Sequence, residues 1–408
     1  MNDSTQERAT APIKKTPSSV PWMVLLLGML ASFGPLSIDM YLPALPNIAN
    51  DLHSSTSLAQ LSLTACLLGI ASGQLFAGPI SDVRGRRGPL LVGLFAYAVS
   101  SLLCVFAPTI WIFVMMRFVQ GVAGSAGIVI SRAIVRDLYS GSEMTKFFSL
   151  LMLVNGVAPI LAPILGGQIL QVTSWRGIFI LLSGLGIVML IVAFFGLDET
   201  LPVTIRSRGG IQNTFRTFRR LIGNKVFMGY ALIQGFVMAA MFAYISASPF
   251  VLQNFFGVSP QMFSLYFAFN ALGIIIAGQM TGGLAGRVHE SKLLVVGLIM
   301  AFVGGGALLV MTLTGGGLYS ILVPLFLVVS SVGVVGTSSF SLAMQDQAKA
   351  AGSASALIGL LSFIFGGVMA PLVGIAGSHT AIPMGITIAV AETAAVLSYL
   401  VLVKPGKL

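Results

Sequence analysis

The sequence predicts an all-α integral membrane protein whose twelve transmembrane helices form two halves of six. Of its 408 residues, 56% are hydrophobic and 8% are charged, and the mean hydropathy is +0.97, whereas soluble domains carry about 25% charged residues. Runs of about 20 apolar residues, long enough to cross a hydrocarbon core as a helix, recur along the whole chain. The longest polar connection, at residues 198–225, separates these runs into two sets of six.

These runs leave little of the chain for a soluble domain. The spans predicted for the N-terminal half, 22–197, are 22–44, 58–79, 89–107, 109–132, 147–170 and 177–197. Those predicted for the C-terminal half, 226–403, are 226–249, 261–285, 292–314, 318–342, 352–376 and 381–403. Polar tails at 1–21 and 404–408 complete the predicted organisation, with 198–225 as a basic linker between the halves.

The polar segments predict how the chain is oriented. Span one follows a polar tail and lacks a cleavage site of small residues, so we expect it to be retained rather than removed as a signal peptide. With a cytoplasmic N-terminus, all but three of the 22 Lys and Arg fall on the inside, the exceptions being Arg117, Arg132 and Arg176. Because positive residues favour the cytoplasmic side, we predict that both tails face the cytoplasm. This topology and attraction to lipid head groups explain the net charge of +10 without a nucleic acid partner.

Cysteines and histidines do not indicate a metal site. Cys66 and Cys104 fall inside predicted spans two and three, and none of the 3 His has a second ligand at metal spacing. The phosphate loop G-x-x-x-x-G-K-[ST], the G-x-S-x-G elbow and the H-E-x-x-H motif are also missing from the sequence. We therefore predict a protein that is not an enzyme and that needs no cofactor and no metal.

An aspartate stands near the end of the first span. Asp39 belongs to the stretch PLSIDMYLPALP, residues 35–46, in which three prolines mark where the span stops. A carboxyl group removed from water resists ionisation and can hold a proton near neutral pH. Asp39 is therefore a candidate proton carrier facing a cavity. The alternative is a helix-end group near the outer interface, because Asp39 lies about 27 Å along a helix from Pro21 at about 1.5 Å per residue.

The loop after span two reads GPISDVRGRR, and its residues carry a family resemblance. A positive-inside turn would explain its arginines, but not its glycines and aspartate at these intervals. The loop resembles the signature of the major facilitator superfamily, in which it latches the two halves in one state. The residues that match are Gly78, Asp82, Gly85, Arg86 and Arg87.

The second half contains a weaker copy of this loop. GQMTGGLAGR, residues 278–287, follows span eight and shares the first Gly and the last Arg, while Asp82 becomes Gly282 and Gly85 becomes Ala285. Equal placement in two six-span halves indicates an internal duplication. Paired halves around a site at the membrane midplane are typical of secondary transporters.

Span four carries a buried positive charge in the stretch RFVQGVAGS. An Arg in a span costs about 2.5–3.5 kcal/mol on insertion scales, so Arg117 should face protein or a water-filled cavity. With Gln120 and Gly121 it matches a family pattern whose Arg is linked to proton movement, and we expect it to be the charge that tunes Asp39. The alternative is that Arg117 only ties span four to its neighbours by hydrogen bonds. RDLY, residues 136–139, predicts an anchor at the inside end of the span.

Span five combines prolines and glycines in the stretch NGVAPILAPILGG. Such residues disturb a helix and are tolerated in a membrane where neighbouring protein satisfies the freed backbone. Pro159, Pro163, Gly166 and Gly167 resemble a motif associated with antiporters, although Ala162 stands where the broader pattern has Gly. The departure leaves the direction of transport open, and the alternative is a simple kink in a packing helix.

Together these stretches resemble the Bcr/CflA group of twelve-span drug:proton antiporters. The resemblance implies export of bicyclomycin, amphenicols such as chloramphenicol, or other small molecules. Met152, Asn155 and Gln234 are the candidates for the substrate cavity, because polar and methionine side chains suit adaptable binding. Glu392 is a second carboxyl within a span, and an acid in the membrane is a candidate for function. The twelfth span is peripheral in this superfamily, so the sequence favours no coupling role for Glu392 and leaves its role open.

The leading prediction is a proton-coupled secondary transporter that exports small drug-like molecules by alternating access. Coupling would arise because proton and substrate favour different states of the protein. Its partners would be a small-molecule substrate, protons and membrane lipid, and it would act as a monomer in the bacterial inner membrane. The alternative is a proton-coupled symporter or exporter of a small metabolite.

Overall fold

The computed structural model describes residues 20–139, 141–206, 218–345, 347, 351–377 and 380–403. Over these ranges the chain is built from helices and their connections, which confirms the predicted all-α membrane fold. Residues 1–19 of the predicted N-terminal tail, the predicted C-terminal tail and the middle of the predicted linker lie outside the described residues.

The N-terminal half contains six long helices. They are α1 (Val20–Asp39), α3 (Thr56–Arg84), α4 (Arg87–Val105), α5 (Ile110–Leu138), α6 (Gly141–Val172) and α7 (Trp175–Gly196). A short 3-10 turn (Leu42–Ala44) and α2 (Leu45–Asp51) connect α1 to α3. Another 3-10 turn (Val203–Ile205) follows α7.

The C-terminal half repeats this arrangement with six further long helices. They are α9 (Lys225–Pro249), α10 (Pro260–Leu284), α11 (Glu290–Leu313), α12 (Leu318–Met344), α13 (Ala351–Val373) and α14 (Ile382–Ser398). Short π-helical segments extend α9 (Phe250–Phe255) and α14 (Tyr399–Val403), and a 3-10 turn (Gly374–Ala376) ends α13.

In the described part of the chain, eleven of these helices are long and apolar enough to cross a membrane. The twelfth, α6, contributes a shorter apolar stretch, Gly156–Val172, to this set. Observed boundaries differ from the predicted ones by a few residues at most ends. The first span differs in kind, because α1 stops at Asp39 and the chain turns at Met40 and Tyr41 before it continues as short helices.

Polar residues at the helix starts explain several of these boundaries. The side chains of Ser55, Asn224 and Ser259 accept hydrogen bonds from backbone N–H groups in the first turns of α3, α9 and α10, at 3.3, 3.1 and 3.3 Å. Such caps satisfy donors that have no partner within the helix. Pro260, directly after its cap, occupies the first helical position, where its missing N–H costs nothing.

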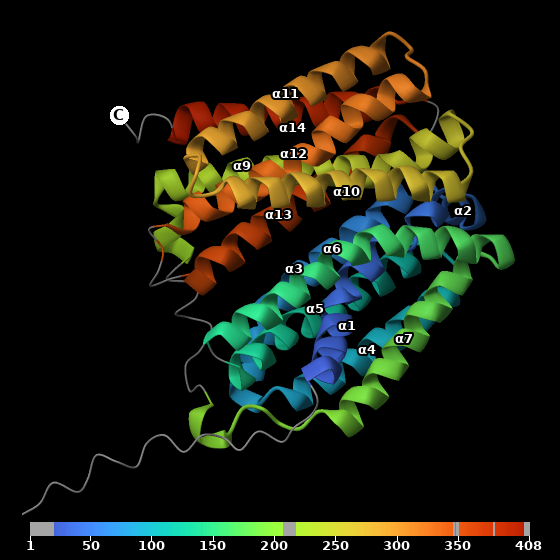
Figure 1. Ribbon diagram of the computed structural model, residues 1–408. Helices are drawn as coiled ribbons and strands as arrows, with labels where there is room; N and C mark the ends of the chain where they lie inside the picture. Colours follow the sequence, from blue (N-terminus) through green and yellow to red (C-terminus); the bar gives the residue numbers. More distant parts are fainter. Residues whose placement is uncertain are drawn as a thin grey trace, which may run out of the picture.

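The two halves pack alike. Figure 1 shows α1 to α7 as one group of helices and α9 to α14 as another. In the first half Gly121 of α5 lies against the carbonyl of Cys66 on α3, and in the second half Gly333 of α12 lies against the carbonyl of Ile274 on α10. A larger residue would clash at either place, so each helix pair approaches closely through a glycine. These matching contacts support the predicted duplication.

The halves meet at one end of the molecule, which we call the closed end. There, side chains of one half donate hydrogen bonds to backbone carbonyls of the other. The pairs are Ser57 to Pro371 (2.9 Å), Gln60 to Ser246 (2.9 Å), Thr64 to Gly367 (2.7 Å), Gln253 to Pro43 (3.0 Å), Gln261 to Gly167 (2.9 Å) and Ser264 to Pro163 (2.7 Å). In Figure 1 the two groups are close near α2 and spread apart toward the opposite end, which we call the open end.

Candidate functional site

A cavity of about 960 Å³ lies between the two halves. Its described lining includes the polar side chains of Asp39, Gln74, Arg132, Arg136 and Gln234. The remainder is mostly apolar, with Met238, Met241, Phe242, Phe267, Phe340 and Phe363 from the second half. A mostly apolar pocket with a few convergent polar groups is the usual form of a small-molecule site.

Asp39 is the last residue of α1 and lines this cavity on the side of the closed end. It is 5% exposed, and within the described ranges no hydrogen bond or ion pair reaches its carboxylate. The hydroxyl of Tyr244, which also lines the cavity, accepts a hydrogen bond from the Asn270 amide at 2.9 Å. Asp39 is therefore both a helix-end residue and a cavity residue, because α1 breaks inside the protein.

Arg117 is fully buried on α5, but it does not pair with Asp39. One guanidinium nitrogen donates to the Ser37 carbonyl at 2.7 Å and another to the side chain of Gln120. The guanidinium also lies over the Tyr41 ring, 4.2 Å from its centroid. This arrangement is the tie between spans that was the alternative for Arg117. Its role in proton movement stays a prediction.

The neighbours of Arg117 extend this network around the end of α1. Gln120 donates from its amide to Ser101 Oγ at 2.7 Å, and the hydroxyls of Ser37 and Tyr97 lie 2.7 Å apart. Arg117 therefore holds the backbone two residues before Asp39 in place.

The predicted latch loop forms an ionic cluster. Arg86 is paired with Asp82 and donates from Nε to Asp137 at 2.8 Å. Its backbone N–H donates to Glu199 at 2.7 Å, and the Arg87 N–H donates to the same carboxylate at 3.3 Å. Glu199 thus caps the start of α4 from the connection that follows α7. Neither Asp137 nor Glu199 is among the predicted site residues.

The backbone of Gly85 and the charge of Arg86 both fit the contacts of this cluster. Gly85 has φ of +94°, a conformation that favours glycine, and an added Cβ would meet the Glu199 carboxylate. Burial lowers the pKa of the Arg86 guanidinium, but Asp137 and Asp82 raise it by more, so its pKa is raised above the ordinary value. Gly78 lies further back on α3, facing Val129 at 3.6 Å. The contacts described for the loop are with the N-terminal half and with Glu199 and Arg206 at the start of the linker.

We expect Glu199→Ala to destabilise the protein by about 1–2 kcal/mol, because the first turn of α4 loses its charged cap. Thermal unfolding of the purified protein measures this as a lower midpoint. Asp198→Ala is the matched control, since Asp198 is exposed and next to Glu199. Equal midpoints for the two variants would show that the cap contributes no stability.

The span-five motif lies at the closed end, where α6 meets α10 and the turn after α1. Gly166 has its backbone against the Met40 carbonyl, with no room for a Cβ. The Pro163 and Gly167 carbonyls accept the hydrogen bonds from Ser264 and Gln261 given above. Pro159 lines the cavity instead. Pro163 and Gly167 therefore build part of the contact between the halves, whereas Gly166 packs within the N-terminal half.

Of the residues predicted for the substrate cavity, the structure places only Gln234. Gln234 lines the cavity, and its carbonyl oxygen accepts a hydrogen bond from Ser339 at 2.9 Å. The side chains of Met152 and Asn155 lie outside the described residues. Arg136, predicted as an anchor, and Arg132 also line the cavity.

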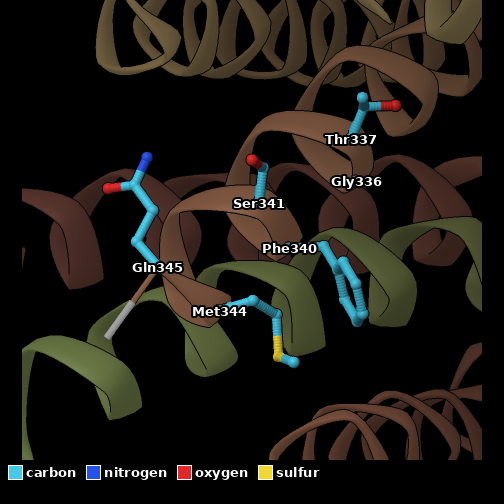
Figure 2. A pocket seen from close by; sticks show the side chains of 6 residues that line it. All are labelled: Gly336, Thr337, Phe340, Ser341, Met344 and Gln345. Carbon is cyan, nitrogen blue, oxygen red and sulfur yellow. The ribbon is translucent and has the colours of Figure 1, made fainter. Parts of the chain in front are cut away.

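A groove on α12 adjoins the open end of the cavity. Figure 2 shows the side chains that line it, with Phe340 and Met344 on one side of the helix and Thr337 and Ser341 on the other. Gly336 and Phe340 line both the groove and the cavity. Ser341 and Gln345 each donate to a Glu290 carboxylate oxygen at 3.0 Å. The groove is an extension of the open end rather than a separate site.

Glu392 lies on α14, away from the cavity. It is 0% exposed, and neither carboxylate oxygen has a hydrogen-bond partner among the residues that the structure describes. Its Cβ and Cγ face the backbone of Gly305 on α11. A buried polar group without a partner costs stability rather than adding to it.

We therefore expect Glu392→Leu to keep transport and to leave stability unchanged or raise it by about 1–3 kcal/mol, since a side chain of similar volume replaces an unsatisfied group. The thermal midpoint and the transport rate of the same preparation test this. Loss of transport in Glu392→Leu with full activity in Glu392→Gln would instead give the polar group a role.

Comparison with known proteins finds one family and several related transporters. Residues 25–371 match the pattern of the Major Facilitator Superfamily. An uncharacterized MFS-type transporter, YdgK of Bacillus subtilis, is 47% identical over 89% of this chain and 90% of its own length. A bicyclomycin resistance protein homolog of Haemophilus influenzae is 31% identical, covering 92% of this chain and 94% of its own. The multidrug resistance protein MdtL of Salmonella paratyphi C is 32% identical over 58% of this chain and 60% of its own.

Solved structures support the same fold. A bacterial homolog of the human lysosomal transporter Spinster, in an inward-facing and unoccupied conformation, aligns with a TM-score of 0.70. The alignment covers 95% of this chain and 96% of the other, at 16% sequence identity. At that identity the likeness concerns the fold alone.

Proposed function

The chain belongs to the major facilitator superfamily, and from this premise we propose that it is a proton-coupled exporter of small drug-like molecules. As a member of this family it is a multi-pass membrane transporter and not an enzyme. The observation that carries the proposal is the buried carboxyl of Asp39, which lines the cavity on the side of the closed end. The names of the Haemophilus and Salmonella relatives support small antibiotics as substrates.

The proposed cycle uses Asp39 for both proton and substrate. With the cavity open to the cytoplasm, Asp39 releases its proton, and a substrate with a hydrogen-bond donor occupies the carboxylate. With the cavity open to the outside, a proton displaces that donor and the substrate leaves. Coupling then follows because proton and substrate compete for one group.

The charge pattern supports the assignment of sides. The open end carries the arginine-rich connections, including Arg84, Arg86 and Arg87 after α3, and such residues favour the cytoplasm. In the proposed orientation the described conformation faces inward, and both chain ends are cytoplasmic. The protein works as a monomer in the bacterial inner membrane, without a bound cofactor.

Inverted vesicles with an imposed pH gradient test this function directly. We expect chloramphenicol or bicyclomycin to accumulate inside the vesicles as protons leave, and expression in a pump-deficient host to raise tolerance to the same compounds. Movement of substrate in the same direction as protons would favour the alternative, a symporter. This alternative stands because Ala162 replaces the Gly of the antiporter motif. No movement of any compound in a broad panel would contradict drug export.

A further inference from the structure

Two arginines face the cavity from one side of α5. Arg132 and Arg136 lie one helical turn apart, both line the cavity, and both are exposed to it. Residues four apart on a helix share a face. Since α5 ends at Leu138 by the open end, Arg132 lies deeper and Arg136 lies closer to the mouth.

These arginines have no counter-charge in the described part of the chain. Three other described arginines are paired with acids: Arg86 with Asp82 and Asp137, Arg176 with Asp51, and Arg206 with Glu199. Glu290 is occupied by Ser341 and Gln345, and Glu392 is buried elsewhere. Among the described residues, no ion pair or hydrogen bond reaches the guanidinium of Arg132 or Arg136. A cation kept in a span without a partner is a candidate for function.

The charges of the cavity are therefore unequal. Its described lining holds two cations and a single acid, Asp39, at the other side. The net charge of Asp39, Arg132 and Arg136 is positive whether Asp39 is ionised or protonated. An organic cation is therefore repelled in both states. The guanidinium presents a planar fork of N–H donors that matches carboxylate, sulfonate, nitro and carbonyl oxygens. The methionines and phenylalanines opposite match an apolar body.

We propose that Arg132, supported by Arg136, binds the oxygen-rich end of the substrate and selects neutral or anionic molecules with an apolar body against organic cations. This inference rests on the proposed function, whose substrate class it names. It makes Arg132 a binding residue that the resemblance to known exporters does not assign.

Binding to the purified full-length protein tests the inference apart from transport. The probes are 2-naphthalenesulfonate and 2-naphthylmethylammonium, which share one aromatic body and differ in charge, and neutral chloramphenicol. We expect measurable binding of the sulfonate and of chloramphenicol, and at least about tenfold weaker binding of the ammonium. Arg132→Gln should weaken sulfonate binding about tenfold, Arg132→Lys should restore part of it, and Arg84→Gln, outside the cavity lining, should change nothing.

The outcomes separate the two claims. Equal affinity for the sulfonate and the ammonium, or unchanged sulfonate affinity in an Arg132→Gln protein with a normal thermal midpoint, overturns the inference. Proton-driven export of chloramphenicol by the wild type would then still support the proposed function. Arg132-dependent binding without any proton-driven export would uphold the inference and remove the proposed function. Failure of the wild type to bind any of the three probes would overturn the inference.

Discussion

Replacing Asp39 by Asn is expected to reduce proton-driven export to background while leaving the fold intact. The substitution keeps the shape of the side chain and removes its ability to take up and release a proton. Asp39 is the single acid among the described cavity residues, so no neighbour on that wall can replace it. The amide oxygen can still accept a hydrogen bond from a substrate, but it takes up no proton, so the proton and the substrate no longer compete for this group.

Two measurements on the same preparation check this expectation. In vesicles with a pH gradient, the rate of chloramphenicol export should fall to that of empty vesicles. In weakly buffered solution, addition of chloramphenicol should release protons from the wild type and none from Asp39→Asn. Proton release on binding is the direct sign of linkage between the two ligands.

Glu392→Gln is the matched control for Asp39→Asn. Like Asp39→Asn, it replaces a buried carboxyl group within a span by an amide. Glu392, however, does not line the cavity. We expect Glu392→Gln to retain both export and proton release. Gradient-driven export that survives in Asp39→Asn would mean that another group carries the proton, and loss of export in Glu392→Gln would point to Glu392.

The spans and the latch arginines could be predicted because their causes are local. Apolar runs of sufficient length form helices in a membrane wherever they occur, and arginines in short loops follow the positive-inside pattern. Glu199 could not be assigned from the sequence. It reaches Arg86 across 113 positions of the chain, and only the packing of α7 beside α4 brings the two together.

The environment of the buried charges was harder to predict for the same reason. The cost of an unsolvated charge indicates that Arg117 must face protein, but not which groups it meets. Its partner, the Ser37 carbonyl, depends on the rotation of α5 and on where α1 breaks. Arg132 and Arg136 near the end of a span could equally extend to the interface. The packing of α5 against its neighbours fixes the rotation of this helix, and in that rotation both arginines line the cavity.

Gly166→Ala is expected to cause the second large loss of export. A Cβ at this position would overlap the Met40 carbonyl, and both partners are backbone atoms that cannot rotate away. Overpacking of this kind costs about 1–3 kcal/mol. Gly166 and Met40 both belong to the N-terminal half, but Met40 begins the turn whose Pro43 carbonyl accepts a hydrogen bond from Gln253 of the second half. Displacement of this turn therefore destabilises the conformation that is closed at this end. The equilibrium should therefore shift toward a conformation that is open there.

A cysteine reporter measures that shift. Ser246 is fully buried at the closed end, where its carbonyl accepts the hydrogen bond from Gln60. With Cys66 and Cys104 replaced, Ser246→Cys should react slowly with a membrane-impermeant maleimide added from outside. Addition of Gly166→Ala should accelerate this reaction and reduce export together.

Gly184→Ala separates this effect from the general cost of a new methyl group. Gly184 lies on α7 in the same half, and an added Cβ there meets nothing within 4 Å, so export and labelling should stay at the wild-type level. If Gly166→Ala behaves like Gly184→Ala, close approach to Met40 is not needed to close this end. If only Gly166→Ala opens it, the glycine acts by letting α6 seal against the end of α1. The span-five motif would then set which side of the membrane can reach Asp39, which is what an exporter needs in addition to a proton carrier.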